Sequence, residues 1–257
     1  MNSMDYVNGL FNLEGHVGIV TGASRGLGMG TAQVLTDAGA TVYNFDIAPR
    51  SDERKITGNM IDVEIDVTDR AALKKAVEKI ISKEGQLDFL INNAGITFKC
   101  PTEEFPDDRF ERILDINLRT GWELSRICYP YLKNSAYVGR VVNITSMAAY
   151  LGHSNTVPYC MTKSGMKGLT IGLAEEWKYD NILVNSVAPG WFSTNLNQEL
   201  YRQNPERGKA AMAKPMLGRF GDPVEIGYMM LFLLSQASTY ITAHDFPVDG
   251  GALAHGF

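Results

Sequence analysis

A glycine-rich turn near the start of the chain constrains the fold more than any other stretch of the sequence. An apolar run at residues 17–20 leads into the sequence TGASRGLG at residues 21–28, and a helical pattern then continues to residues 38–39. Glycines at this spacing let the backbone turn sharply and approach a pyrophosphate that faces the N-terminus of the helix. A strand-to-helix turn without a ligand is the alternative when the turn is considered alone.

A second strand pattern supplies the context for this turn. Residues 41–46 end in Asp46, 18 residues after Gly28, and a carboxylate about 20 residues beyond such a turn binds a ribose 2′-hydroxyl. The two features predict a βαβ unit that binds a dinucleotide. Its contacts would come from Gly22, Ser24, Arg25, Gly26, Leu27, Gly28 and Asp46.

The acid at position 46 predicts a preference for NAD. Its carboxylate would accept hydrogen bonds from both ribose hydroxyls and would repel the 2′-phosphate of NADP. Arg25 and Arg50 could attract that phosphate, so the use of NADP as well stays open.

Strand and helix patterns alternate along the rest of the chain. They predict strands at residues 61–66, 87–91, 140–144, 182–187 and 241–248, and helices at 72–81, 107–132, 159–177 and 224–234. Residues 1–14 are expected to form a surface arm and residues 48–59 a loop. With no internal repeat or linker, residues 1–257 are expected to form one α/β domain, a doubly wound (Rossmann) parallel sheet of about seven strands flanked by helices on both faces.

Composition argues against several classes of function. The formal net charge of −5 and the lack of a lysine or arginine cluster argue against a nucleic-acid partner. No apolar run approaches about 18 residues and no signal-peptide pattern opens the chain, so a cytoplasmic location without membrane contact is expected. Three widely spaced cysteines fit reduced thiols, and with four scattered histidines no metal site is expected. A small-molecule substrate is the expected partner.

Polar residues gather where the predicted strands end. Asn93, Ala94 and Gly95 follow the strand at 87–91, at the sheet edge where open α/β sheets bind ligands. Asn117 falls within the helix predicted at 107–132, where its side chain could be solvated or could bond a nearby carbonyl.

Ser146, Tyr159 and Lys163 are candidate catalytic residues. Ser146 follows the strand at 140–144, while Tyr159 and Lys163 lie four residues apart on one face of a helix. An ammonium group there would favour the phenolate and lower the pKa of Tyr159. A Tyr–Lys pair alone is commonly a pair of surface neighbours, but with a hydroxyl donor and a dinucleotide it predicts hydride transfer at a carbinol or carbonyl.

Taken in order, these motifs resemble those of the short-chain dehydrogenase/reductase family over nearly the whole chain. The resemblance rests on the turn at residues 21–28, NNAG at 92–95, Ser146, YCMTK at 159–163, PG at 189–190 and VDGG at 248–251. It implies that Asn117 joins Ser146, Tyr159 and Lys163 in a catalytic tetrad. In that tetrad the serine orients the substrate oxygen, the tyrosine exchanges its proton, the lysine holds the nicotinamide ribose, and the asparagine keeps a water in a proton relay.

The resemblance also implies further cofactor contacts and an assembly. Asp66 and Val67 would meet the adenine, while the Phe192 backbone and the Thr194 hydroxyl would hold the carboxamide. Members of the family are usually tetramers, so a homotetramer is implied. Ala243 stands where relatives often have glycine, so a local difference in the backbone is expected there. The remaining implied cofactor contacts are Asn93, Ala94, Gly95, Tyr159, Lys163, Pro189 and Gly190.

The sequence says less about the substrate. A polar lid is expected at about residues 193–217, and Lys99, His153 and Trp191 are candidate substrate contacts that could equally be solvated. Residues 101–106 and 188–194 are similar to the branch containing gluconate 5-dehydrogenase and 2-deoxygluconate 3-dehydrogenase, which favours a sugar acid, sugar or polyol. Reduction of a 3-oxoacyl thioester with NADPH is the alternative reaction, although Asp46 weighs against it. A noncatalytic dinucleotide-binding regulator is the alternative class, although it would not need the intact tetrad.

Overall fold

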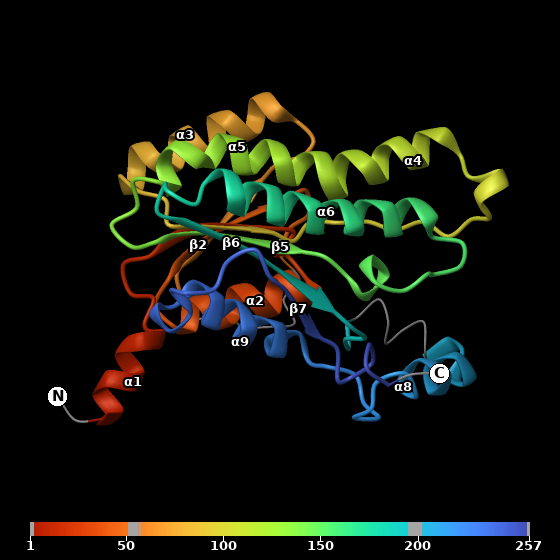
Figure 1. Cartoon of the computed structure of the whole chain (residues 1–257). Helices are drawn as coiled ribbons and strands as arrows, with labels where there is room; N and C mark the ends of the chain where they lie inside the picture. The colour runs from red at the N-terminus through yellow and green to blue at the C-terminus, as the bar shows by residue number, and fades with distance from the viewer. Residues whose placement is uncertain (1–2, 51–55, 57, 195–201, 256–257) are drawn as a thin grey trace.

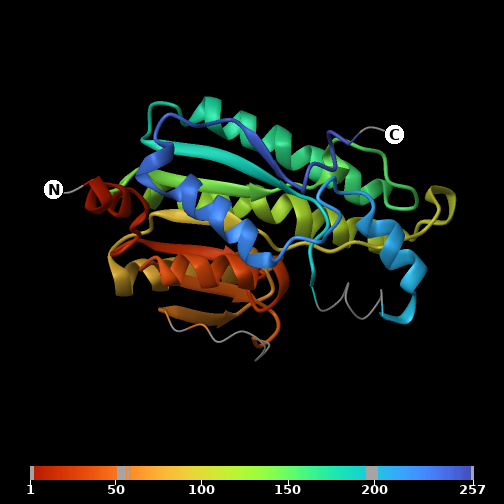
Figure 2. The same cartoon turned by 90° about the horizontal axis from the view of Figure 1, so that it is seen from below.

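The computed structural model describes residues 3–50, 56, 58–194 and 202–255, which form a parallel sheet covered by helices on both faces (Figures 1 and 2). The seven strands lie in the order β3-β2-β1-β4-β5-β6-β7, and every neighbouring pair is parallel. This arrangement confirms the predicted doubly wound sheet. Its strands are β1 (Val17–Thr21), β2 (Thr41–Asp46), β3 (Met60–Glu64), β4 (Phe89–Asn92), β5 (Gly139–Ile144), β6 (Ile182–Pro189) and β7 (Asp245–Val248).

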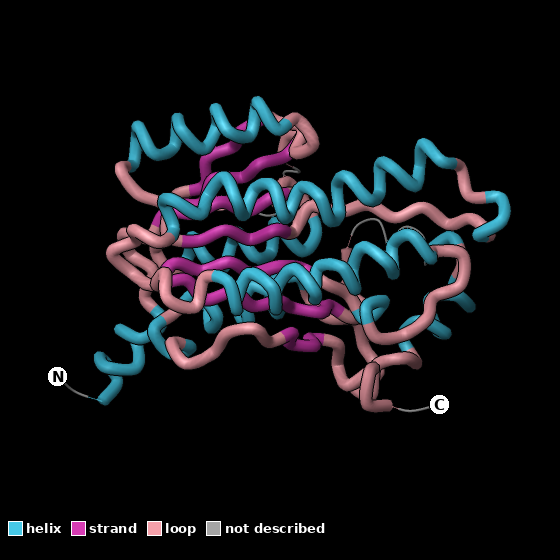
Figure 3. Tube along the Cα trace, turned by 45° about the horizontal axis from the view of Figure 1, so that its top comes forward, coloured by secondary structure: helices cyan, strands magenta, loops and turns pink. Residues whose placement is uncertain are grey.

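Two groups of helices enclose the sheet, as Figure 3 shows. One face is covered by α3 (Arg70–Glu84), α4 (Asp107–Leu114), α5 (Thr120–Leu132) and α6 (Val157–Glu176), and the other by α2 (Gly26–Asp37) and α9 (Pro223–Leu234). Each face has its own buried apolar cluster. Because β1 and β4 are buried along their whole length, they appear in the sequence as largely apolar runs rather than as alternating patterns.

The order of the strands determines where a ligand can bind. The chain moves outward from β1 to β2 and β3, and then returns to place β4 on the other side of β1. Ligands bind outside the carboxyl ends of the strands at such a reversal. The glycine turn, the residues after β4 and the end of β5 therefore meet at one edge of the sheet.

Two segment predictions are wrong at the ends of the chain. Residues 1–14 were expected to be an arm, but Ser3–Phe11 form helix α1, which extends away from the sheet (Figure 1). The last strand is shorter than expected, because Ala243 adopts a positive φ of 63° that interrupts extended backbone before β7. A left-handed conformation costs a residue with a Cβ roughly 1–2 kcal/mol, which accounts for the frequent glycine at this position in relatives.

The helix predicted at residues 107–132 has an irregular centre. Between α4 and α5, residues Asp115–Arg119 form a π-helical turn that contains Asn117, and the Thr120 N–H bonds to the Asp115 carbonyl. Single π turns interrupt the regular hydrogen-bond ladder and are frequent at functional sites. This turn therefore changes the direction in which the buried Asn117 side chain leaves the helix.

The lid expected at about residues 193–217 is only partly described. Residues 195–201 lie outside the described residues, while Pro205–Met212 form α8. Within the part of the chain that the structure describes, no helix is long and apolar enough to cross a membrane. No cluster of three or more metal-binding side chains occurs in the same part of the chain.

Candidate active site

The glycine turn after β1 leaves the N-terminus of α2 open. Gly22 and Gly26 have φ values of 69° and 57°, in the left-handed region that favours glycine. A Cβ on Gly28 would collide with the Gly22 carbonyl and lie 2.6 Å from Asn93 Nδ2. Arg25 precedes α2 without capping it through its side chain. The first N–H groups of α2 therefore remain available for an anion, as a dinucleotide pyrophosphate requires.

The end of β2 is fixed to the glycine turn by hydrogen bonds. The two carboxylate oxygens of Asp46 accept from the Ser24 N–H and the Ala48 N–H, each at 3.1 Å. The Ala23 N–H donates to Asn44 Oδ1 at 2.9 Å. Ser24 is buried, and its hydroxyl donates to the Ala48 carbonyl at 2.7 Å, so its hydroxyl and its N–H both bond within the protein.

A cavity of about 370 Å³ runs along this edge of the sheet. It joins the glycine turn, the end of β2 and the residues after β4, and it reaches α6. Lining residues that the sequence did not single out include Ile47 and Arg112. The predicted cofactor residues that line the cavity are Gly22, Arg25, Leu27, Gly28, Asp46, Asp66, Val67, Asn93, Ala94, Gly95, Tyr159 and Lys163.

Arg112 organises the far end of this cavity. Its guanidinium donates to Asp66 Oδ2 at 3.1 Å and to Thr68 Oγ1 at 3.2 Å. Burial opposes ionisation of Asp66, but hydrogen bonds from Thr68 and Arg112 hold the pKa of this carboxyl below its ordinary value. Nothing in the sequence marks Arg112, because its partner lies 46 positions earlier in the chain.

The predicted cofactor residues at the end of β6 and beyond it lie in three different places. Pro189 and Gly190 line a second cavity rather than the first. Phe192 is buried against Gly221. The Thr194 methyl lies 3.6 Å from the position that a Cβ on Gly26 would occupy, so Thr194 sits close to the glycine turn.

The four predicted catalytic residues converge at the boundary between the two cavities. Lys163 Nζ donates to the Ile144 carbonyl at 2.8 Å and lies 5.7 Å from the Tyr159 ring centroid. The Ser146 hydroxyl accepts from the Ala148 N–H at 3.1 Å and hydrogen-bonds to Tyr159. Asn117 is the fourth member, and its contacts differ from those of a solvated side chain.

Asn117 is buried and fixes the loop after β4. Its Oδ1 accepts from the Ile96 N–H, and its Nδ2 donates to the Ile96 carbonyl, both at 2.8 Å. Nδ2 also lies 3.2 Å from Thr162 Oγ1. A Cβ on Gly95 would lie 3.4 Å from Asn117 Oδ1 and 3.6 Å from Lys163 Nζ, so this glycine lets the loop pass close to both polar groups.

The protonation equilibria differ from the sequence-based expectation. Burial raises the pKa of Tyr159 above its ordinary value, and the hydrogen bond with Ser146 opposes this shift only in part. Burial also lowers the pKa of Lys163 from 10.5 to about 8. The expected lowering of the Tyr159 pKa is therefore wrong. The Lys163 ammonium is directed at the Ile144 carbonyl, and its charge is itself disfavoured by burial.

The second cavity, of about 220 Å³, opens on the other side of Tyr159. Ser146 and Tyr159 line it together with all three candidate substrate contacts, Lys99, His153 and Trp191. Met147 and Leu151 add apolar surface. Since Thr97 and Tyr159 line both cavities, a hydroxyl group in the second can approach a ligand in the first.

Comparisons with known proteins extend across almost the whole chain. The family described as enoyl-(acyl carrier protein) reductase matches residues 22–252. The 3-oxoacyl-[acyl-carrier-protein] reductase of Thermotoga maritima is 33% identical over 246 residues, which cover 93% of this chain and 98% of the relative. The 2-dehydro-3-deoxy-D-gluconate 5-dehydrogenase of Dickeya dadantii is 33% identical over 248 residues, which cover 95% and 98%. A solved Agrobacterium tumefaciens structure of a proposed 2-deoxy-D-gluconate 3-dehydrogenase, with bound NADP, has a TM-score of 0.85, 34% identity and coverage of 96% and 99%.

Proposed function

The chain belongs to the short-chain dehydrogenase/reductase family of nicotinamide-dependent oxidoreductases that act on CH–OH groups, and we propose that its own substrate is a small sugar acid oxidised at a secondary hydroxyl group. The observation that carries this proposal is the second cavity, which places Ser146 and Tyr159 beside the ammonium group of Lys99 and the imidazole of His153. Its volume of about 220 Å³ is below the range of about 300–1,000 Å³ that is usual for drug-sized ligands. A compact polar substrate fits such a cavity better than a steroid or a long acyl chain.

In the proposed mechanism the four members of the tetrad have different tasks. Ser146 donates a hydrogen bond to the substrate oxygen, and Tyr159 removes the hydroxyl proton during oxidation or returns it during reduction. Lys163 holds the nicotinamide ribose, and Asn117 fixes the loop at Ile96 beside it and keeps the water of the proton relay. Bound nicotinamide supplies the hydride chemistry. Two features fit the pyrophosphate of the cofactor. Arg25 does not cap the N-terminus of α2 with its side chain, and Gly28 has no Cβ to keep a ligand away from the backbone.

A second candidate reaction is the reduction of a 3-oxoacyl thioester with NADPH, which the Thermotoga maritima relative favours. A substrate panel separates the two reactions. Aldonates, alditols, free sugars and an acetoacetyl thioester are each assayed with both cofactors, and the highest kcat/KM is expected for an aldonate with NAD. Preferred turnover of the thioester with NADPH would overturn the sugar-acid proposal.

NAD is the proposed cofactor, with NADP as a weaker alternative. Asp46 faces the first cavity, while Arg50 is paired with Asp62 at 2.7 Å. Arg25 lines the cavity and could bind a 2′-phosphate, and the similar Agrobacterium tumefaciens protein holds NADP.

We expect Asp46→Asn to raise the ratio of kcat/KM for NADP over NAD at least about tenfold, because repulsion between charges near 4 Å is worth about 1–4 kcal/mol. Steady-state kinetics with both cofactors measure this ratio. Glu78→Gln, which removes a charge from the exposed face of α3, is the control and should leave the ratio unchanged. An unchanged ratio in Asp46→Asn would show that Asp46 does not exclude the phosphate.

We also propose a single catalytic domain that assembles as a homotetramer in the cytoplasm. Exposed apolar side chains on α5 and α6 support the assembly: Trp122, Met161 and Ile171 have exposed fractions of 46%, 51% and 53%. Apolar surface of this kind marks protein contacts when it is contiguous. Sedimentation of the purified protein gives its mass in solution, and a monomer would contradict the assembly.

A further inference from the structure

The second cavity carries positive charge in a protein that is negative overall. Lys99 and His153 are among its lining residues, and no aspartate or glutamate is among the described residues that line it. The whole chain has a formal net charge of −5. A neutral polyol needs no such charge, so the cavity is suited to an anionic ligand.

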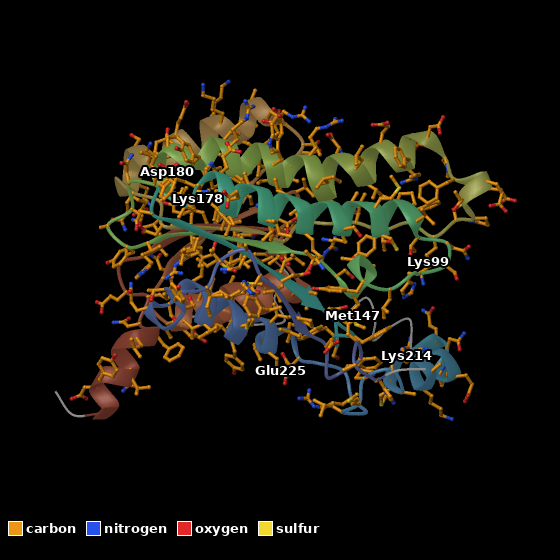
Figure 4. The ribbon with its side chains drawn as sticks, viewed as in Figure 1. Lys99, Met147, Lys178, Asp180, Lys214 and Glu225 are labelled. Carbon is orange, nitrogen blue, oxygen red and sulfur yellow. The ribbon has the colours of Figure 1, made fainter. Side chains whose placement is uncertain are left out.

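A second ammonium group comes from the segment after α8, at Lys214. Burial lowers the pKa of His153, and the positive charges of Lys99 and Lys214 lower it further. Lys214 is therefore near enough to act on the same imidazole as Lys99. Figure 4 shows Lys99, Lys214 and the cavity residue Met147 at the same end of the molecule. The neutral imidazole of His153 can donate one hydrogen bond between the two ammonium groups.

The C-terminal residues hold Lys214 in place. His255 Nδ1 lies 2.9 Å from the Lys214 carbonyl and donates to it, and the Leu217 N–H donates to the Gly250 carbonyl at 3.2 Å. A Cβ on Gly251 would lie 3.0 Å from Met216 Sδ, which shows how closely the two segments pack. The backbone at Lys214 is thus held by contacts with residues 250–255.

We propose that Lys99, His153 and Lys214 form a carboxylate clamp, which binds the acid group of the substrate while its secondary hydroxyl lies at Ser146 and Tyr159. His255 is a positioning residue for this clamp, because it acts through Lys214. The inference rests on the proposed function and narrows it, since neutral polyols and free sugars become poor substrates. Two ammonium groups and an imidazole donor match the two oxygens of a carboxylate.

Matched substrates and matched lysine variants test the clamp. D-gluconate and D-glucitol share a six-carbon polyol chain but differ in the acid group. Lys99→Ala and Lys214→Ala are expected to raise KM for the aldonate about 10- to 100-fold, the effect of losing a charge-assisted hydrogen bond, with less than about threefold change for glucitol. Lys178→Ala removes a lysine at the opposite end of the molecule and should change neither value (Figure 4).

The positioning role of His255 has its own readout. His255→Ala is expected to raise KM for gluconate with little change in kcat, and His255→Gln, which keeps a donor, should restore the value in part. Equal effects of the lysine variants on gluconate and glucitol would overturn the clamp, as would a preference of the wild-type protein for glucitol 6-phosphate over gluconate.

A binding experiment separates failure of the clamp from failure of the proposed function. Calorimetric titration of the protein–NADH complex with gluconate or glucitol measures binding without turnover of the alcohol. Tighter binding of gluconate that is lost in Lys99→Ala and Lys214→Ala supports the clamp even when no aldonate is oxidised, a result that would refute only the sugar-acid reaction. Equal binding of gluconate and glucitol would refute the clamp, whatever the turnover.

Discussion

Replacing Tyr159 by phenylalanine is expected to lower kcat at least about 100-fold, the usual contribution of a positioned acid or base. The substitution removes one hydroxyl group and leaves the ring beside Lys163, whose Nζ lies 5.7 Å from the ring centroid. Cofactor binding should therefore change little. Steady-state kcat and fluorescence titration with NADH measure the two effects separately.

Tyr150→Phe provides a matched control for this experiment. Tyr150 follows the same strand end as Ser146, but its hydroxyl donates to Asp245 Oδ2 at 2.8 Å and it is absent from the residues lining the second cavity in the described part of the chain. Its kcat should remain close to the wild-type value. If Tyr159→Phe kept more than about a tenth of wild-type kcat, Tyr159 would not be the acid or base.

The parts of the site that could be predicted are those that depend on local geometry. The glycine turn has one workable backbone path between a strand and a helix, and Asp46 ends the next strand. Tyr159 and Lys163 lie on one helix face because their spacing requires it. These residues reach the same cavity because parallel strands end at one edge of the sheet.

The parts that could not be predicted depend on contacts between distant segments. Arg112 meets Asp66 across the cavity, and the positive charge of Lys214, in a segment bonded to His255, lowers the pKa of His153. Asn117 was ambiguous because its role depends on a π-helical turn and on the Ile96 backbone, neither of which leaves a pattern in the sequence. Side-chain type alone does not indicate such partners.

The pKa of Lys163 shows that the site is maintained at a cost to stability. Lowering this pKa from 10.5 to about 8 corresponds to about 3 kcal/mol of unfavourable free energy in the charged form. The hydrogen bond to the Ile144 carbonyl offsets part of this cost. A buried cation with one backbone partner is poor design for stability alone, so its presence is better explained by the cofactor and the chemistry.

Lys163→Met is therefore expected to abolish activity and yet to stabilise the fold. We expect kcat to fall at least about 100-fold and the KM for cofactor to rise, because the ribose contact and the buried ammonium are both lost. Removing the buried charge should recover about 3 kcal/mol, while leaving the Ile144 carbonyl unpaired costs about 1–3 kcal/mol. The net gain in the free energy of unfolding at pH 7 is up to about 2 kcal/mol.

The pH dependence of this gain identifies its cause. Between about pH 8 and 10.5 the unfolded wild-type chain keeps the proton on Lys163 while the folded chain loses it, so the wild-type stability rises with pH. The advantage of Lys163→Met should therefore be largest below pH 8 and should shrink by about 1.4 kcal/mol per pH unit above it. Urea unfolding at pH 7 and pH 9.5 measures the difference, with Lys167→Met, one turn further along α6, as the control. A stability difference that is the same at both pH values would show that the buried charge of Lys163 is not its source.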